Sequence, residues 1–202
     1  RLGVLDASEC PPTFRADPEQ VQGIIAGGFP ALCQAVEGAE DNAEAGAEAV
    51  RFREIGKQDV FIGIAASGRT PFIWGGIWEA NKRGAKTALL CFNPTLKIPR
   101  DNKPNAVINP KIGPELLTGS TRLKSGTATK LILNIITTLA MVQIGKVVGN
   151  LMVDLDPSNT KLRDRAVRIV RQLTGTDEPQ AREALEKSNW VVKKAIARLA
   201  KR

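Results

Sequence analysis

The feature that most restricts the fold is a short apolar run, Val60–Ala65 (VFIGIA), which contains no polar residue. A strand without polar alternation is typical of a parallel sheet that is covered on both faces. Thr70 and Pro71 then suit the N-cap and first position of a helix that we expect to run to about Arg83, where Gly84 stops it. A buried strand followed directly by a helix predicts an α/β architecture.

The neighbouring segments extend this pattern. Further buried strands are predicted at Thr87–Cys91 and at Val21–Ala26, the latter closed by a Gly-Gly pair, and a short further strand is predicted at Ala106–Ile108. Phe29–Arg51 is rich in Ala and Glu, which predicts a helix over that range. The alternation of strands and helices predicts an α/β fold with a mostly parallel sheet.

The C-terminal half is expected to be helical. Residues 125–148 are so apolar that little polar face remains, which predicts a helix buried nearly all round, inside the domain or against another subunit. Three shorter helices should form a small basic bundle, with Asp177 and Ser188 as candidate caps. Their expected ranges are 159–173, 178–187 and 190–200.

Composition excludes several function classes. The 202 residues, 43% hydrophobic and 25% charged, are typical of a soluble globular protein, and no apolar run reaches the roughly 18 residues of a membrane span. The absence of histidine excludes Ser-His-Asp and Cys-His catalysis. No set of carboxylates has metal-ligand spacing, so we expect no metal. The lack of an apolar run long enough for a membrane span leads us to expect no membrane partner.

The three cysteines are odd in number and widely spaced, which predicts reduced thiols. The N-terminus lacks a signal-peptide pattern, so we expect the protein in the cytoplasm.

The net charge of +8 is unevenly distributed along the chain. Residues 1–50 carry −7, residues 51–150 carry +10 and residues 151–202 carry +5. Nucleic-acid binders more often show a basic stripe with interleaved aromatic residues, and aromatic residues are only 4% here. We therefore expect a small anionic ligand and no nucleic acid.

The loop Ala65–Pro71 (AASGRTP) is the strongest local indication of a binding site. It joins a predicted strand to a helix start, where Ser67 and Thr70 offer hydroxyls and the helix offers backbone N–H groups. Gly68 and Arg69 complete the candidate set. The alternative is a tight, capped turn without a ligand.

A set of carboxylates in the acidic first quarter could serve acid/base chemistry. Glu37 and Glu40 are three residues apart, so one helix face could present both, although a solvated helix surface is the simpler explanation of such a pair. Glu9 lies two residues before Pro11-Pro12, which restricts the backbone beside its carboxylate. With no histidine in the chain, proton transfer would fall to carboxylates, Lys, Cys or a hydroxyl.

A second hydroxyl-rich loop precedes the long apolar helix. Ser120, Thr121 and Lys124 lie in the segment 118–127 (TGSTRLKSGT), and such residues suit phosphate or carboxylate recognition. The alternative is a loop that only caps the helix.

Several of these blocks together resemble a known family. The segments RLGVLDASECPPTF, IIAGG, AVEGAED, GIAASGRTP, GPELLTGSTRLKSGTATKLILN and GKVVGNLMVD are similar, in order along nearly the whole chain, to N-acetylmuramic acid 6-phosphate etherases. These bacterial enzymes have a sugar isomerase (SIS) domain and are related to the animal glucokinase regulatory protein.

The resemblance implies a cofactor-independent lyase of cell-wall sugar recycling. It would cleave the D-lactyl ether of N-acetylmuramic acid 6-phosphate to N-acetylglucosamine 6-phosphate and D-lactate, by removal of the C2 proton, loss of lactate from C3 and addition of water. Glu9 falls on the family's acid/base position and Glu40 on its second catalytic glutamate. Ser67 and Thr70 match the sugar-phosphate loop, and Ser120 and Thr121 the second loop.

The same resemblance implies a three-layer αβα SIS domain over residues 1–155, a ubiquitin-associated-like helical region over 156–202, and a homodimer. It also implies a strand and a Gly-Ser/Thr loop before Arg1, so we expect either a fragment or a shortened relative. Two alternatives stay open: a non-catalytic sugar-phosphate-binding regulator, and an aldose–ketose isomerase on the same fold.

Overall fold

The computed structural model describes residues 1–200, which form two compact units. The first, here called the sheet unit, comprises Arg1–Val4 and Ile24–Ile132. The second, the helical unit, comprises Leu5–Gly23 and Leu133–Arg202. The division falls within the helices α1 (Leu2–Phe14) and α4 (Lys124–Gln143).

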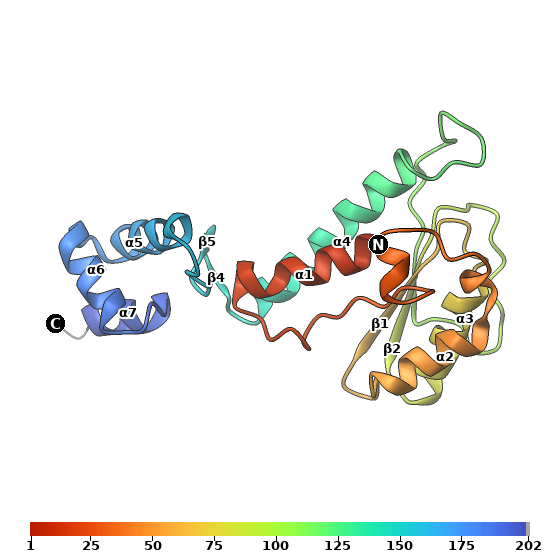
Figure 1. Cartoon of the computed structure of the whole chain (residues 1–202), viewed down its shortest axis with the longest axis horizontal. Helices are drawn as coiled ribbons and strands as arrows, with labels where there is room; N and C mark the ends of the chain where they lie inside the picture. The colour runs from red at the N-terminus through yellow and green to blue at the C-terminus, as the bar shows by residue number, and fades with distance from the viewer. Residues whose placement is uncertain (201–202) are drawn as a thin grey trace. The chain divides into compact units, whose positions relative to one another are not determined.

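The sheet unit is built on three parallel strands in the order β1-β2-β3 (Figure 1). The strands are β1 (Val60–Ile64), β2 (Lys86–Leu90) and β3 (Ala106–Ile108), with Ile62 opposite Ala88 and Leu90 opposite Ile108. Helix α3 (Pro71–Lys82) connects β1 to β2, and Gly84 follows it at φ +83°, which is the expected helix stop. The predicted α/β fold with a parallel sheet is confirmed.

Helices α2 (Ala43–Phe52) and α3 pack closely against each other (Figure 1). A Cβ atom added at Gly75 of α3 would lie 1.8 Å from the carbonyl oxygen of Ala43, and one added at Gly46 of α2 would lie 1.9 Å from that of Phe72. Only glycine permits this approach of the two backbones. The core beneath them is formed by Val50, Ala80 and Ala85 on one side and by Trp74, Ile77, Leu89 and Cys91 on the other.

Two predictions about residues 21–51 are wrong. Val21–Ala26 forms no strand: its residues are irregular, and the glycine pair after it turns the chain at positive φ. The range 29–51 is not one helix but the short 3-10 turns η1 (Phe29–Leu32) and η2 (Ala39–Asp41) followed by α2. Gly38 breaks the helix at φ +74°, and Asn42 starts α2 afresh because its side chain accepts the amide of Ala45 at 2.9 Å.

Helix α4 differs from its expectation in extent and burial. It ends at Gln143, and the hairpin β4 (Val147–Val148) and β5 (Leu151–Met152) follows it. An apolar stripe of the helical unit, Ile135, Leu139 and Val142, is exposed by 56, 54 and 41%. Burial of this face inside the domain is therefore wrong, whereas burial against another subunit stays a prediction.

Helix α4 is long and apolar enough to cross a membrane by length and composition, a test that the core helix of a soluble protein also passes.

The C-terminal helices α5 (Thr160–Thr174), α6 (Glu178–Glu186) and α7 (Val192–Leu199) pack together, as expected. Asp177 caps α6, because its carboxylate accepts the amide of Gln180 at 2.9 Å. Ser188 is not a cap: it is buried, and Val191 stands at the N-cap of α7. The boundary at residue 155 stays a prediction.

Candidate functional site

The loop after β1 lies at the carboxyl end of the strand and leads into α3. The buried indole of Trp74 donates to the carbonyl of Gly68 at 2.8 Å, and the side-chain amide of Asn93 donates to the carbonyl of Ser67 at 3.0 Å. Gly68 has φ +70°, and a Cβ there would lie 2.3 Å from Leu96. The loop is therefore held firmly by its backbone.

The polar side chains of this loop are exposed or, in Thr70, half-buried. Ser67 and Arg69 are exposed, and the Ser67 hydroxyl accepts the amide of Arg69 at 3.2 Å. Thr70 occupies the N-cap position of α3, as predicted, but its side chain makes no capping hydrogen bond. The first turn of α3 also contains no acidic residue. The backbone closes the turn instead, because the amides of Ile73 and Trp74 donate to the carbonyl of Thr70 at 3.1 and 3.3 Å. A role of this loop in substrate binding stays a prediction.

Two asparagines beside the loop were not among the site residues predicted from the sequence. Asn93 follows β2 and Asn109 follows β3. The side-chain amide of Asn109 donates to the backbone carbonyl of Asn93 at 2.7 Å. Together with the bond from Asn93 to Ser67, this contact ties the segments after all three strands to one another. Their position at the carboxyl ends of predicted parallel strands was the signal that could have revealed them.

The loop before α4 contains a carboxylate that the sequence analysis did not assign. The two oxygens of Glu115 accept the amides of Lys124 at 3.0 Å and Ser125 at 2.9 Å. The next two amides, of Gly126 and Thr127, donate to carbonyls of the same loop at 2.9 Å each. All four N–H groups of the first turn are thus engaged, so the helix-capping alternative describes the start of α4 correctly.

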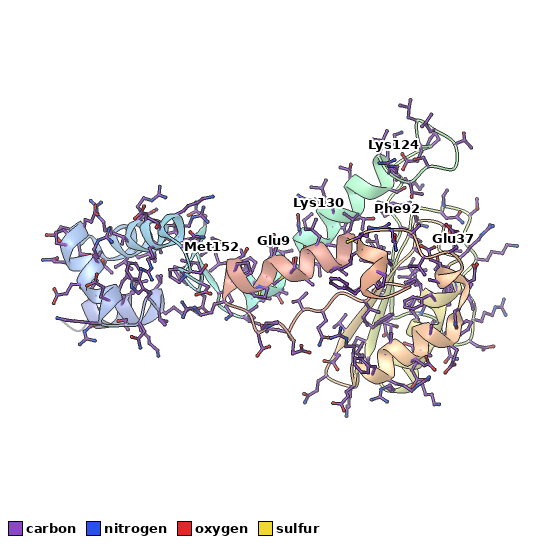
Figure 2. The ribbon with its side chains drawn as sticks, viewed as in Figure 1. Glu9, Glu37, Phe92, Lys124, Lys130 and Met152 are labelled. Carbon is purple, nitrogen blue, oxygen red and sulfur yellow. The ribbon has the colours of Figure 1, made fainter. Side chains whose placement is uncertain are left out.

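The residues of this second loop that are predicted to bind substrate lie in the segment that Glu115 caps. Thr121 and Lys124 are exposed and Ser120 is half-buried, with its hydroxyl accepting the amide of Arg122 at 3.4 Å. Figure 2 shows Lys124 at the beginning of α4. A role in substrate binding for Ser120, Thr121 and Lys124 stays a prediction.

Glu115 leads to a prediction about pH. Hydrogen bonds from the backbone amides of Ser125 and Lys124 lower the pKa of Glu115 below its ordinary value near 4.5. The stabilisation by this cap should be complete above that ordinary value and lost as the pH falls through the lowered one. We expect the NMR amide shifts of Lys124 and Ser125 to titrate below pH 4.5, and to stop titrating in Glu115→Gln. A midpoint at or above the ordinary value would contradict the cap.

The candidate acid/base residues are both exposed. Glu9 lies on α1 (Figure 2) and Glu40 lies in η2. The expected helix face shared by Glu37 and Glu40 is wrong, because Gly38 in the left-handed region separates Glu37 from the short turn that contains Glu40. Glu9 belongs to the helical unit and Glu40 to the sheet unit, and their joint action stays a prediction.

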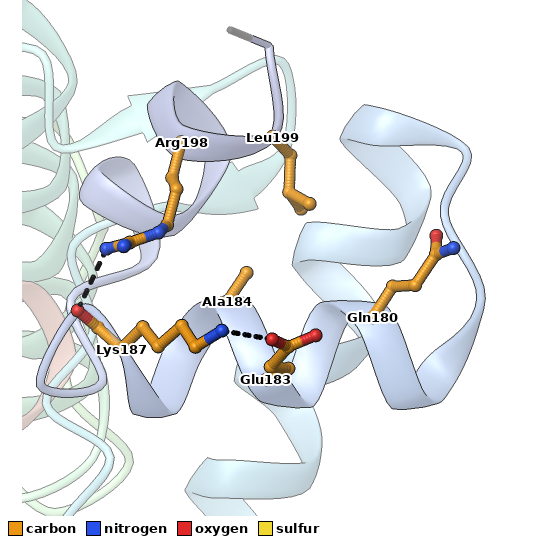
Figure 3. Close-up of a pocket in the computed structure, with 6 residues that line it drawn as sticks. All are labelled: Gln180, Glu183, Ala184, Lys187, Arg198 and Leu199. Atoms are coloured by element: carbon orange, nitrogen blue, oxygen red, sulfur yellow. Dashed lines mark hydrogen bonds and ion pairs between the residues drawn. The ribbon is translucent and has the colours of Figure 1, made fainter. Parts of the chain in front are cut away.

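A small pocket lies elsewhere, between α6 and α7 (Figure 3). Lys187 pairs with Glu183 inside it, and Arg198 donates to the carbonyl of Lys187 at 3.3 Å. None of the predicted site residues lines it. Among residues 1–200, no group of three or more Cys, Asp or Glu side chains could hold a metal ion.

Comparison with known proteins bears on the function. The N-terminal SIS domain of glucokinase regulatory protein matches residues 1–80, and the C-terminal lid domain of the same protein matches residues 149–201. The N-acetylmuramic acid 6-phosphate etherase of Alkaliphilus metalliredigens is 53% identical over 196 residues, which cover 97% of this chain and 63% of the relative. The chain resembles these etherases over nearly its whole length.

Other relatives with the same name agree. The etherase of Gloeobacter violaceus is 54% identical and that of Staphylococcus epidermidis 49% identical, each over 97% of this chain. The chain spans 63% and 66% of those two relatives, which is less than two thirds of the length of the curated proteins it matches. The resemblance inferred from the motifs is confirmed.

Proposed function

We propose that the protein is a carbon–oxygen lyase that cleaves the D-lactyl ether of N-acetylmuramic acid 6-phosphate. The observation that carries this proposal is the identity of about 50% to etherases over 97% of the chain. The products would be N-acetylglucosamine 6-phosphate and D-lactate, as in the recycling of cell-wall amino sugars. We place this activity in the cytoplasm, where three free thiols would remain reduced.

The proposed reaction is an elimination followed by a hydration. A base removes the proton from C2, the C3–O bond breaks, and its electron pair leaves with lactate, which takes up a proton. Water then adds its oxygen to C3 and a proton to C2. Each step is acid/base chemistry, so the proposal needs no cofactor, and glutamates can carry every proton. We assign Glu9 as the acid/base residue and Glu40 as the second carboxylate.

The two loops are proposed to bind the sugar phosphate. The exposed hydroxyl of Ser67 and the hydroxyl of Thr70, which makes no capping hydrogen bond, support this role at the start of α3, where the helix dipole favours an anion. Gly68 is buried and allows the loop to pack closely against Leu96, which would hold the substrate-binding backbone in place, and the exposed Arg69 adds a positive charge. Ser120, Thr121 and Lys124 would contact the remainder of the substrate.

The direct test is release of D-lactate from N-acetylmuramic acid 6-phosphate. We expect stoichiometric D-lactate and N-acetylglucosamine 6-phosphate from the purified chain or from any longer protein that its gene encodes. Absence of D-lactate from both would refute the lyase. Appearance of an isomerised sugar phosphate without lactate would identify the aldose–ketose isomerase instead.

We further propose a homodimer, with the exposed stripe Ile135, Leu139 and Val142 as part of its interface. Exposed apolar stripes of this kind are typical of subunit contacts. Leu139→Glu should convert a dimer into a monomer in light scattering, whereas Gln172→Glu, on the exposed surface of α5, should leave the mass unchanged. A monomeric unmodified protein would contradict the proposal.

A regulatory role is the second candidate function. It is favoured by the matches to two domains of glucokinase regulatory protein. In that case calorimetry should detect binding of a sugar phosphate while no lactate is released. Turnover of the bound sugar would exclude a purely regulatory role.

A further inference from the structure

The seam between α1 and α4 in the helical unit contains a buried carboxylate, Asp6. Its side chain is 8% exposed, and no other Asp, Glu, Lys or Arg is buried among the residues that the structure describes. Burial of an ionisable group is unfavourable unless hydrogen bonds replace the lost water. Asp6 is three residues before Glu9, which makes its contacts relevant to the proposed reaction.

Two donors from α4 meet one oxygen of this carboxylate. The side-chain amide of Asn134 donates to Asp6 Oδ1 at 2.6 Å, and the hydroxyl of Thr137 lies 3.3 Å from the same atom. The Thr137 hydroxyl also donates to the carbonyl of Leu133 at 3.0 Å, so Asn134 supplies the stronger bond. These contacts join positions 128 and 131 residues apart in the sequence.

Apolar packing continues the seam on the same face of α1. Cys10 is one turn after Asp6, and its thiol lies 3.5 Å from the Asp6 carbonyl. Cys10 and Phe14 form a buried cluster with Ala16 and Met141. Glu9 is adjacent to this face and exposed, so a rotation of α1 about its axis would move the Glu9 carboxylate.

The backbone of α1 is weakened immediately after Glu9. Pro11 and Pro12 lie inside the helix and have no N–H, so the helical bonds to the carbonyls of Ala7 and Ser8 cannot form. Side-chain contacts must therefore supply the order that the backbone ladder lacks. Apolar packing resists separation of the two helices, but a directional hydrogen bond also fixes their rotation and register.

We propose that Asp6 is a positioning residue, which fixes α1 on α4 through Asn134 and thereby holds the Glu9 carboxylate in place on the helical unit. This proposal rests on the function proposed above. A single oxygen accepts both bonds, so the role requires an acceptor at this position and not a negative charge.

The kinetic test compares two substitutions of Asp6. Asp6→Ala removes the acceptor and should lower kcat by about 10- to 100-fold, as expected for a displaced catalytic group, with KM changed less than threefold. Asp6→Asn keeps an acceptor oxygen and should restore kcat to within about threefold of the unmodified protein. Asn134→Ala should reproduce Asp6→Ala, and the double variant should be no worse. Asp17→Ala, an exposed carboxylate of the same unit, is the control.

A second measurement does not depend on activity. Cys10 and Cys91 are buried and Cys33 is exposed, so in a Cys33→Ser background a thiol reagent should react slowly with both remaining cysteines. Asp6→Ala should accelerate the reaction of Cys10 at least about tenfold and leave Cys91, in the sheet unit, protected. Unfolding of the whole chain would expose both thiols, which separates it from opening of the seam.

The kinetic and thiol measurements together test the role of Asp6, and the thiol measurement does so without lyase activity. Unchanged protection of Cys10 in Asp6→Ala, or an Asp6→Asn variant as impaired as Asp6→Ala, would overturn it. If the unmodified protein releases no lactate, the proposed function fails, and the thiol measurement still shows whether Asp6 fastens α1.

Discussion

Replacing Glu9 with glutamine is expected to lower kcat for D-lactate release by about 10²- to 10⁴-fold, because the proposed elimination depends on proton transfer by this carboxylate. Glu40→Gln should have an effect of similar size. Glutamine preserves the shape of the side chain but removes its negative charge and its ability to exchange a proton. Both glutamates are exposed, so neither substitution should change the urea unfolding midpoint.

Matched controls separate this role from a general effect of charge. Glu19→Gln in the helical unit and Glu48→Gln in α2 each remove one exposed carboxylate and should retain activity. A near-normal rate for Glu9→Gln or Glu40→Gln would remove that residue from the mechanism. A loss of rate accompanied by an equal loss in the controls would point to the overall charge instead.

The largest effect on stability is expected for Gly75→Ala. The added methyl would lie 1.8 Å from the carbonyl oxygen of Ala43, so α2 and α3 would have to move apart. We expect a loss of about 3 kcal/mol, net of the roughly 1 kcal/mol that alanine gains over glycine within a helix. The free energy of unfolding in urea measures this directly.

Gly56→Ala is the control for the glycine prediction. A methyl at that position would lie 3.7 Å from the nearest carbonyl oxygen, which is an ordinary contact. It should therefore change the unfolding free energy by less than about 0.5 kcal/mol. Equal stability of Gly75→Ala and the unmodified protein would show that the helices can separate without cost.

The sheet unit was largely predictable because its signals are local. The strands β1, β2 and β3 are short apolar runs closed by turn residues, and α3 has its proline at the start and its glycine after the end. Helix α1 was not predicted, since the pair Pro11-Pro12 argues against a helix. Its fastening to α4 by Asp6 and Asn134 joins residues 128 positions apart, which no local pattern can reveal.

The position of the first candidate loop was predictable for the same reason. The hydroxyl residues Ser67 and Thr70 were expected between a strand and a helix, and they lie there. Glu115 was overlooked because its partners are nine and ten residues further along the chain. The sequence also could not show which backbone amides are bonded at the two helix starts: a side-chain carboxylate accepts two of them in α4, whereas only the carbonyl of Thr70 accepts those of Ile73 and Trp74 in α3.

The cap by Glu115 has a consequence for competition between anions. A carboxylate tethered to its own helix end has an effective concentration in the millimolar range or above, so a free anion must exceed that value to displace it. At the start of α4 the Glu115 carboxylate thus competes with any free anion for the amides of Lys124 and Ser125. The first turn of α3 has no acidic residue and no side-chain cap. The amides of Ile73 and Trp74 already donate to the carbonyl of Thr70 at 3.1 and 3.3 Å. Inorganic phosphate should accordingly perturb the amide of Phe72 at concentrations that leave those of Lys124 and Ser125 unchanged.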